Sequence, residues 1–503
     1  MYMREEDRIW IATGGGGAEP IYMLPKMMTR HGLVTGATGT GKTTTIKVMA
    51  EAFSEMGASV FIADIKGDVS GLAMPGEPNA SVDERVKSMG IQGFTFMGFP
   101  ARFFDLYGSK GIPVRTTVSS MGPLLLARIL GLNDTQTGVL QIVFKVADDS
   151  GMLMLDFKDL RAMVQHAGEN AKSLTTQYGN VTTASVGAIQ RSLLALESAG
   201  GDIFFGEPEL DLGDWLAAEG QGQGVINILD CVTLFQNPLL YSTFLLWMLS
   251  ELYEIMPEVG DLDKPKMVFF FDEAHLLFND APKALLQKIE QVVRLIRSKG
   301  IGIYFITQSP ADIPNAVLAQ LGNKIQHALR AYTPNDQKAI KAAAASFRPN
   351  PGFDSETAIG DLATGEALVS ALDEKGAPQM VQRGFIVPPR CSFGVAPPEL
   401  VDQITKGSPL YTKYSQSFDR YSAFEALGEM AQRQEREREQ EAAEAQREKE
   451  KAQKEKAAAK PKPKSGSKSS NAIDRAVASS VSQIGRSVSR EIVRGIFGTS
   501  KKR

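Results

Sequence analysis

The chain has 503 residues, of which 43% are hydrophobic and 22% are charged, a balance that excludes a wholly disordered or fibrous protein. The formal net charge of −3 conceals an uneven distribution. Residues 431–503 carry 19 Lys and Arg against 10 Asp and Glu, whereas residues 1–430 carry 36 against 48. An acidic body is not the charge profile of a protein coated in DNA-binding residues, so the body could hold a polyanion only through a local basic lining, such as a pore.

Cysteine usage and hydropathy indicate the compartment. Cys231 and Cys391 lie far apart in the sequence, which encodes neither a disulfide framework nor a zinc cluster. The N-terminal segment lacks the apolar core of a secretory signal. The richest apolar stretch, residues 238–256, is interrupted by Ser, Thr and Glu, which favours a buried helix over a membrane span. We therefore expect a cytoplasmic protein without a membrane span.

Short runs rich in β-branched and aromatic residues, bounded by Gly, Pro and Asp, predict strands along the body of the chain. They are residues 31–37, 59–65, 94–100, 225–231, 267–272 and 302–307. Most are continuously apolar, which is typical of a parallel sheet covered on both faces. Helical patterns, for example residues 43–57 and 282–300, alternate with them and predict an α/β domain. Near the end of the body, residues 366–372 and 379–387 predict a hairpin.

The region 120–218 differs from its surroundings, because it has helix-like periodicity and no convincing strand. We interpret it as an α-helical insertion that divides the α/β core into two parts, residues 1–119 and 219–430. After residue 430 the composition changes to Glu, Lys, Arg, Gln and Ala. This charged, low-complexity linker, residues 431–471, is either a solvated helix held by charge pairs or disordered.

Residues 472–503 resume an apolar stripe at helical spacing with basic flanks, which predicts a basic amphipathic C-terminal helix. Its many small residues make it a marginal helix by itself. Three fates stay open: docking on a hydrophobic groove, lying on a membrane surface or nucleic acid, or disorder. We predict docking, because the apolar stripe has no use on a wholly solvated helix.

A phosphate-binding loop follows the first predicted strand. Residues 36–43 match the pattern G-x-x-x-x-G-K-[ST] between a strand and a helix. The glycines let backbone N–H groups converge on phosphate oxygens at a helix N-terminus, Lys42 can reach the β- and γ-phosphates, and the Thr43 hydroxyl can bind Mg²⁺. The predicted nucleotide-binding residues are Gly36, Ala37, Thr38, Gly39, Thr40, Gly41, Lys42, Thr43 and Thr44.

Two adjacent carboxylates end the apolar run 267–271. Asp272 is placed to hold the water shell of Mg²⁺, as the second acidic residue of phosphate-loop NTPases does. Glu273 is placed to orient and deprotonate the attacking water as a general base. The role of His275 stays open between a relay of nucleotide state and a structural histidine.

Further polar residues lie near the ends of later elements. Gln308 follows the strand 302–307 and either senses the γ-phosphate or caps the strand. A guanidinium delivered to the γ-phosphate can accelerate phosphoryl transfer about 10³–10⁵-fold. Arg294, Arg297 and Arg330 are candidates for this role, and each is otherwise a surface salt-bridge partner.

One further turn, residues 64–68 (Asp-Ile-Lys-Gly-Asp), follows the second strand. It should lie at the carboxyl edge of the sheet, where α/β proteins bind ligands.

Together these motifs resemble those of the HerA/FtsK superfamily of hexameric DNA-pumping ATPases, in particular the bacterial HerA-like helicase-domain proteins. The matching segments are GATGTGKT, ADIKGD, FFFDEAH, the block from RSKG to TQSP, LRAYTPNDQ and FFDLYGSKGIPVRTTV. The resemblance spans roughly residues 20–400. It implies a RecA-like P-loop NTPase core with a mostly parallel sheet, here with a large α-helical insertion and a charged helical or disordered C-terminal extension.

The same resemblance implies ATP and Mg²⁺ as cofactors, a homo-oligomeric and in that family hexameric ring, double-stranded DNA as substrate, and a nuclease or other protein partner. It makes Gln308 equivalent to the glutamine that ends the fourth strand in the family. It favours Arg297 as a finger acting on a neighbouring subunit, with Arg330 second. HerA helicases also carry an N-terminal β-barrel, implicated in ring assembly and nuclease docking, and the residues that precede Gly36 are too few for it. The helical insertion and the C-terminal extension are candidates to replace it.

The leading interpretation is therefore an ATPase that translocates on or unwinds double-stranded DNA. The alternative is an ATP-driven switch or remodeller that acts on a protein partner without DNA. A small-molecule kinase is disfavoured, because the Asp-Glu pair suits hydrolysis better than transfer to a hydroxyl.

Overall fold

The structure is a computed structural model that describes residues 1–17, 19–219, 222–278 and 283–458. Within these residues the main sheet has 13 strands. Its parallel part, in spatial order, consists of β13 (Asn323–His327), β4 (Gly32–Thr35), β12 (Ile301–Thr307), β11 (Met267–Phe271), β5 (Ser59–Asp64), β10 (Ile226–Asp230), β6 (Ala101–Asp105) and β7 (Ile112–Pro113). An antiparallel part continues from β13 through β14 (Glu366–Ser370), β15 (Gln382–Ile386), β2 (Arg8–Gly14) and β1 (Tyr2–Met3), with β3 (Glu19–Met23) also on β2.

Alternate side chains of the central strands enter two different cores. On β11, Phe269 and Phe271 pack into the core that contains α9 (Pro238–Ile255) and α11 (Lys283–Leu295). Val268 and Phe270 pack into the core that contains α1 (Lys42–Glu55). Because both faces of the sheet are covered, these strands carry no polar alternation, as the sequence predicted.

One predicted strand is wrong. Residues 94–100 form no strand, and β6 begins at Ala101. In this segment Met97 and Phe99 donate their N–H groups to the carbonyls of Arg390 and Leu72. A Cβ at Gly98 would lie 2.6 Å from the carbonyl oxygen of Ala73, so the backbone is held against the 3-10 helix Ser70–Ala73 instead of a strand.

The other predicted strands and the hairpin are confirmed, the hairpin as the antiparallel pair β14 and β15. The predicted helix 43–57 is α1, and the predicted helix 282–300 becomes α11 followed by a 3-10 turn, Ile296–Lys299. The strands β1, β2 and β3 were not predicted.

The remaining short helices are α2 (Ala80–Ser88), α8 (Asp202–Phe204), α10 (His275–Phe278), α12 (Asn315–Leu318), α13 (Pro334–Ala345) and α14 (Ser355–Asp361). In addition, β8 (Ala218–Glu219) pairs with β9 (Gln223–Gly224).

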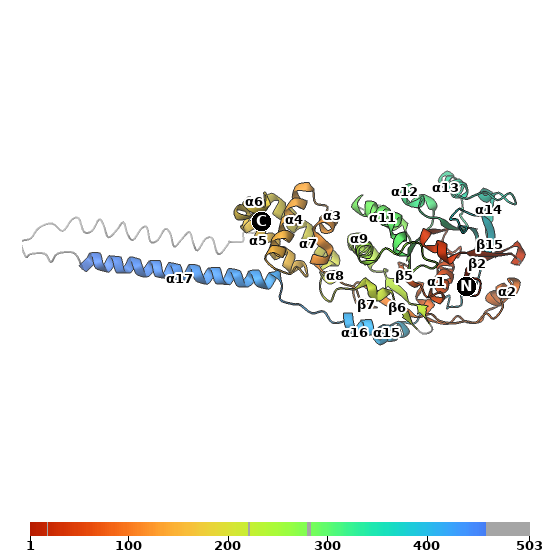
Figure 1. Ribbon diagram of the computed structural model, residues 1–503, viewed down its shortest axis with the longest axis horizontal. Helices are drawn as coiled ribbons and strands as arrows, with labels where there is room; N and C mark the ends of the chain where they lie inside the picture. The colour runs from red at the N-terminus through yellow and green to blue at the C-terminus, as the bar shows by residue number, and fades with distance from the viewer. Residues whose placement is uncertain (18, 220–221, 279–282, 459–503) are drawn as a thin grey trace, which may run out of the picture. The chain divides into compact units, whose positions relative to one another are not determined.

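Helices follow β7 without a strand until β8 in the described chain. They are α3 (Val118–Ile129), α4 (Asp134–Asp149), α5 (Phe157–Glu169), α6 (Ala171–Tyr178) and α7 (Thr183–Leu196), and α3, α4, α5 and α7 pack on one another (Figure 1). Four of them begin at residues whose side chains accept a backbone N–H of the first turn: Thr117, Asn133, Asp156 and Thr182.

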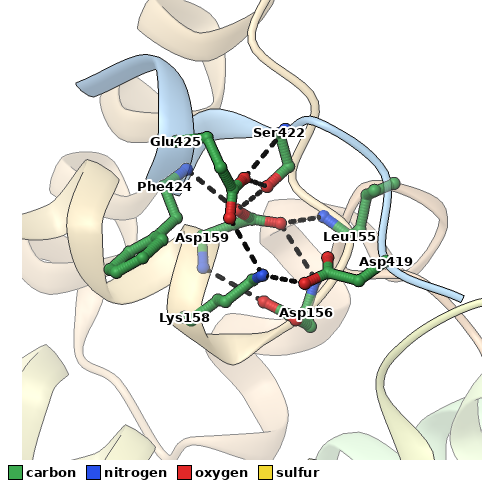
Figure 2. Close-up of polar contacts among 8 residues, drawn as sticks. All are labelled: Leu155, Asp156, Lys158, Asp159, Asp419, Ser422, Phe424 and Glu425. Atoms are coloured by element: carbon green, nitrogen blue, oxygen red, sulfur yellow. Dashed lines mark hydrogen bonds and ion pairs between the residues drawn. The ribbon is translucent and has the colours of Figure 1, made fainter. Parts of the chain in front are cut away.

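The segment after α15 (Pro398–Gly407) and α16 (Pro409–Tyr414) is fixed to α5 by a buried carboxylate. Figure 2 shows Asp159, which is fully buried, accepting the N–H groups of Leu155 (2.8 Å) and Phe424 (3.0 Å) and the hydroxyl proton of Ser422. It also accepts the N–H of Asp156 at 3.3 Å. One side chain therefore serves both the start of α5 and the start of α17 (Ala423–Ala458).

We expect Asp159→Ala to lower the free energy of unfolding by about 2–4 kcal/mol, because it leaves several buried donors without an acceptor. Urea unfolding of the full chain would measure this. Asp148→Ala, at an exposed position on α4, is the matched control and should stay within about 0.5 kcal/mol of the wild type. Equal effects of the two substitutions would contradict the role of Asp159.

Contacts divide the chain after Met430, and the described part of the second unit, residues 431–458, is helical throughout. Wherever its burial is described, this segment is exposed, so of the two alternatives left open for the charged region the structure has the solvated helix up to Ala458. The predicted linker after that residue and the amphipathic helix 472–503 lie outside the described residues. Among the helices that the structure describes, none is both long and apolar enough to span a membrane.

Candidate active site

The phosphate loop connects the end of β4 to the start of α1. Gly36, Gly39 and Gly41 have φ of 153°, 75° and 115°, values that other residues rarely adopt. At Gly36 there is also no room for a side chain, since a Cβ would lie 2.5 Å from the Cβ of His327. The glycines are therefore required by the shape of the loop.

Lys42 lies inside the curve of the loop. Its Nζ donates to the carbonyl oxygens of Gly36 (2.6 Å) and Ala37 (3.1 Å), and only 5% of the residue is exposed. Burial, followed by the nearby charge of Lys66, lowers the pKa of Lys42, although Glu273 and Asp272 act in the opposite direction. The ammonium group is thus held where it would face a bound phosphate.

The rest of the loop is braced by its own hydroxyl groups and backbone. Thr40 Oγ1 donates to the Ala37 carbonyl at 2.7 Å, and its own carbonyl accepts the N–H of Gly365. Thr38 and Gly39 are exposed at the tip, and Thr44 is half-buried in the first turn of α1. The tip is therefore accessible while its base is fixed.

His327, at the end of β13, packs against the phosphate loop at Gly36. It was not identified from the sequence. Its ring is fully buried, with Nδ1 3.0 Å from the Glu366 carbonyl and Nε2 2.8 Å from Thr45 Oγ1. A carbonyl can only accept, so Nδ1 carries the proton and Nε2 accepts from Thr45. Burial lowers the pKa of His327 to about 4, with the Glu366 carbonyl opposing and Lys42 assisting this shift.

This shift predicts acid sensitivity. The unfolded chain protonates His327 below about pH 6.5, but the folded chain does so only below about pH 4, so stability is lost as the pH falls through this interval. Lowering the pH from 7 to 5 should cost about 2 kcal/mol through His327 alone. Urea unfolding at both pH values should show that His327→Gln loses this difference, whereas His166→Gln, at a half-exposed position on α5, should retain most of it. An unchanged pH dependence in His327→Gln would contradict the assignment.

The two carboxylates after β11 have different environments. Asp272 is 4% exposed, and burial raises its pKa despite the opposing charge of Lys66. Burial also acts to raise the pKa of Glu273, but the ion pair with Lys66 outweighs it, so this pKa lies below its usual value. Glu273 has φ of 46°, a strained conformation for a residue with a side chain and a feature that clusters at functional sites.

The turn after β5 lies beside both carboxylates. Lys66 Nζ is 2.7 Å from Glu273 Oε1 and 3.7 Å from Asp272 Oδ2. Two residues later, Asp68 Oδ2 accepts the hydroxyl proton of Thr43 at 3.1 Å. The sequence placed this turn at the carboxyl edge of the sheet but did not indicate these partners.

These side chains have the chemistry of a magnesium site. The two predicted ligands are Thr43 and Asp272. Asp68 contacts Thr43, and its other oxygen, Oδ1, is buried without a hydrogen-bond partner among the described residues. Mg²⁺ prefers oxygen ligands and keeps several waters, so one or two protein ligands suffice. The residues present fit Mg²⁺.

A cavity of ≈ 330 Å³ opens next to Ala37 of the phosphate loop. Gln308 and His275 line it, as does Arg330, whose guanidinium donates to the carbonyls of Gly360 and Leu362 (3.2 Å to the latter). Gln308 and Arg330 thus lie at the same edge of the sheet as the phosphate loop of their own chain.

Arg297 lies at the other edge. It precedes β12, which runs parallel to β4, so the seven residues of β12, about 23 Å of strand, separate it from the level of the loop. Its guanidinium pairs with Asp261 at 2.7 Å and lines a second cavity together with Arg30 and Arg294. Arg297 and Arg294 are therefore not brought together with the phosphate loop of the same chain.

Several known proteins are similar to this chain. The DNA double-strand break repair helicase HerA of Sulfolobus acidocaldarius is 21% identical over 346 residues, which is 68% of this chain and 62% of the relative. The HerA helicase of Sulfurisphaera tokodaii has the same identity and coverage over 354 residues. A probable helicase of Methanocaldococcus jannaschii is 31% identical over 125 residues, 24% of this chain and 22% of the relative. The chain thus spans less than two thirds of the length of these relatives.

Among solved structures, the plasmid coupling protein TrwB in complex with ADP and Mg²⁺ is similar with a TM-score of 0.52 and 14% identity, covering 78% of this chain and 93% of that chain. This likeness confirms the predicted α/β fold with a RecA-like core. Residues 12–503 match the family described as Helicase HerA-like C-terminal. Because this match covers nearly the whole chain, the protein belongs to the HerA-like helicase C-terminal family.

Proposed function

We propose that the protein hydrolyses ATP in a magnesium-dependent reaction at the carboxyl edge of the parallel sheet. The observation that carries this proposal is the position of Glu273, which follows β11 and reaches the same edge as the phosphate loop after β4. Its lowered pKa keeps it ionised at neutral pH, as a general base requires.

Each of the other residues has a role that its position supports. The loop N–H groups and Lys42 would bind the β- and γ-phosphates. Thr43 and Asp272 would hold Mg²⁺, which when bound neutralises charge on the phosphate oxygens. Gln308 and Arg330, in the cavity beside Ala37, are placed to contact the γ-phosphate or the attacking water.

We propose further that hydrolysis drives movement along, or unwinding of, double-stranded DNA. Membership of a family named for a helicase supports this, as do two relatives named as DNA double-strand break repair helicases. The acidic body makes a direct test necessary. ATP turnover should rise several-fold when duplex DNA is added, and the increase should disappear at high salt, since phosphate contacts release counterions. Equal turnover with and without duplex would leave the ATP-driven switch or remodeller of a protein partner in its place.

We propose that the active form is a cytoplasmic homo-oligomer, a hexameric ring, with a nuclease or another protein as partner. The position of Arg297 supports an oligomer. At the edge of the sheet opposite the phosphate loop it cannot reach its own nucleotide, but it could reach that of a neighbouring subunit.

Mixing two inactive variants tests this arrangement. Arg297→Ala and Lys42→Ala proteins should together recover part of the wild-type turnover, because some interfaces combine an intact loop with an intact arginine. Steady-state ATPase assays over a range of mixing ratios would measure the recovery.

A mixture of Lys42→Ala with Glu273→Gln is the matched control and should stay inactive, since both defects lie within one subunit's site. Absence of recovery in rings that are shown to exchange subunits would transfer the role to Arg330 or exclude a finger acting between subunits.

A further inference from the structure

Glu273, the residue proposed above as the base, is bound on one side only. Its Oε1 forms the ion pair with Lys66 at 2.7 Å. Its Oε2 lies 3.2 Å from His275 Nδ1, an ion pair only if His275 is protonated, and within the described part of the chain neither buried atom makes a hydrogen bond. Lys66 is therefore the strongest restraint on the position of this carboxylate.

The same ion pair opposes the chemistry assigned to Glu273. A general base must offer a lone pair to the proton of the attacking water. The ammonium group of Lys66, at 2.7 Å, occupies the lone pairs of Oε1 and holds the carboxylate toward the Asp64–Val69 turn. The Lys66 side chain is 35% exposed, so it can leave the pair for solvent, whereas the Glu273 side chain is 10% exposed and cannot.

The turn that carries Lys66 also contacts a residue of the proposed magnesium site. The carboxylate of Asp64 accepts the N–H groups of Gly67 (2.7 Å), Asp68 (3.3 Å) and Val69 (3.2 Å), which makes the segment a compact turn. Within this turn Asp68 accepts the hydroxyl proton of Thr43. Because Thr43 donates its hydroxyl proton in this bond, its oxygen lone pairs would stay available to Mg²⁺, as an outer-shell partner of a metal ligand ensures. A displacement of Asp68 would therefore also displace Lys66.

From these contacts we propose that Lys66 is a positioning residue that withholds Glu273 from the attacking water, and that the Asp64–Val69 turn couples its release to occupancy of the magnesium site through Asp68. The proposal rests on the assignment of Glu273 as the base. It makes basal hydrolysis slow, because the pair holds the carboxylate in its present position until Lys66 is released.

Binding of a non-hydrolysable ATP analogue with Mg²⁺ tests the proposal without turnover. If binding of the analogue must open the Lys66–Glu273 ion pair, a substitution of either residue removes the free-energy cost of opening it. Lys66→Gln and Glu273→Gln should each bind the analogue about two- to fivefold more tightly than the wild type, the range expected for a partly exposed ion pair. The double variant should bind no more tightly than either single variant. Lys66→Arg, which keeps a cation, should bind more like the wild type than Lys66→Gln does.

Two more measurements complete the test. Turnover of Lys66→Gln without DNA should rise by a similar factor, and urea unfolding of the nucleotide-free protein should show that the effects of Lys66→Gln and Glu273→Gln are not additive. Lys110→Gln is the matched control. It removes the same charge at the same edge of the sheet, from a pair with Asp230 at 3.2 Å, and should change neither affinity nor turnover.

The outcomes separate the two assignments. If Glu273→Gln hydrolyses ATP normally, the base is misassigned and the proposed catalytic role fails. If Glu273→Gln is inactive but Lys66→Gln binds the analogue more weakly, or binds and turns over as the wild type does, only the restraint by Lys66 is overturned. Weaker binding would show that Lys66 contacts the nucleotide directly.

Discussion

Lys42→Ala should reduce ATP turnover by at least about 10²–10³-fold, the range seen when one preorganised charge-stabilising donor is removed from an active site. Lys42 is buried in the loop, and among the described residues the hydrogen-bond acceptors of its Nζ are the carbonyls of Gly36 and Ala37. No other lysine lies within the loop, so the phosphate would lose its one fixed ammonium partner there. Isothermal titration would measure the nucleotide affinity, and a steady-state assay would measure the turnover.

Lys338→Ala, at an exposed position on α13, is the control for a general loss of positive charge and should behave as the wild type. Normal circular dichroism of Lys42→Ala would exclude unfolding as the cause. Wild-type affinity and turnover in a folded Lys42→Ala protein would contradict the location of the nucleotide site.

The positions of the site residues that the sequence indicated depend on local signals. The phosphate loop combines a fixed spacing with glycines whose positive φ the turn requires, and both properties are encoded within nine residues. The position of Asp272 follows from the apolar run before it, since a buried parallel strand delivers its next residue to the ligand-binding edge. The strand order was not predictable in the same way, because β12 lies between β4 and β11 although it follows both in the chain.

The contacts that were missed join distant segments. The pairing of β15 with β2 brings Phe385 opposite Thr13, and neither segment carries a local signal for the other. The ion pair of Lys66 with Glu273 likewise depends on β5 and β11 being neighbours in the sheet. These contacts arise from tertiary packing and not from local propensity.

The arginines show a signal that was available in the sequence. Arg297 precedes a parallel strand and therefore lies at the amino edge, whereas Arg330 follows one and lies at the carboxyl edge. This distinction, which follows from strand direction alone, separates a residue that can act on its own nucleotide from one that cannot.

Glu273→Gln should leave ATP binding intact but reduce turnover by about 10²–10⁴-fold, the contribution of a positioned general base. The amide has nearly the same shape as the carboxylate but cannot accept a proton from water at neutral pH. The strained backbone at this position, φ of 46°, is unchanged by the substitution, so the fold of the site should persist. A single-turnover assay with preincubated ATP would show bound, unhydrolysed nucleotide.

Asp230→Asn is the matched control, because it neutralises a carboxylate at the end of β10, another parallel strand of the same sheet edge, where its partner is Lys110. It should hydrolyse ATP at the wild-type rate. Both variants lose one negative charge at this edge of the sheet, but only Glu273→Gln loses the proposed base. The comparison therefore separates the effect of losing the proton acceptor from the effect of losing a charge. Near wild-type turnover in Glu273→Gln would require another proton acceptor. The residue to test would then be His275, because it lines the cavity beside the phosphate loop and its Nδ1 lies 3.2 Å from Glu273 Oε2.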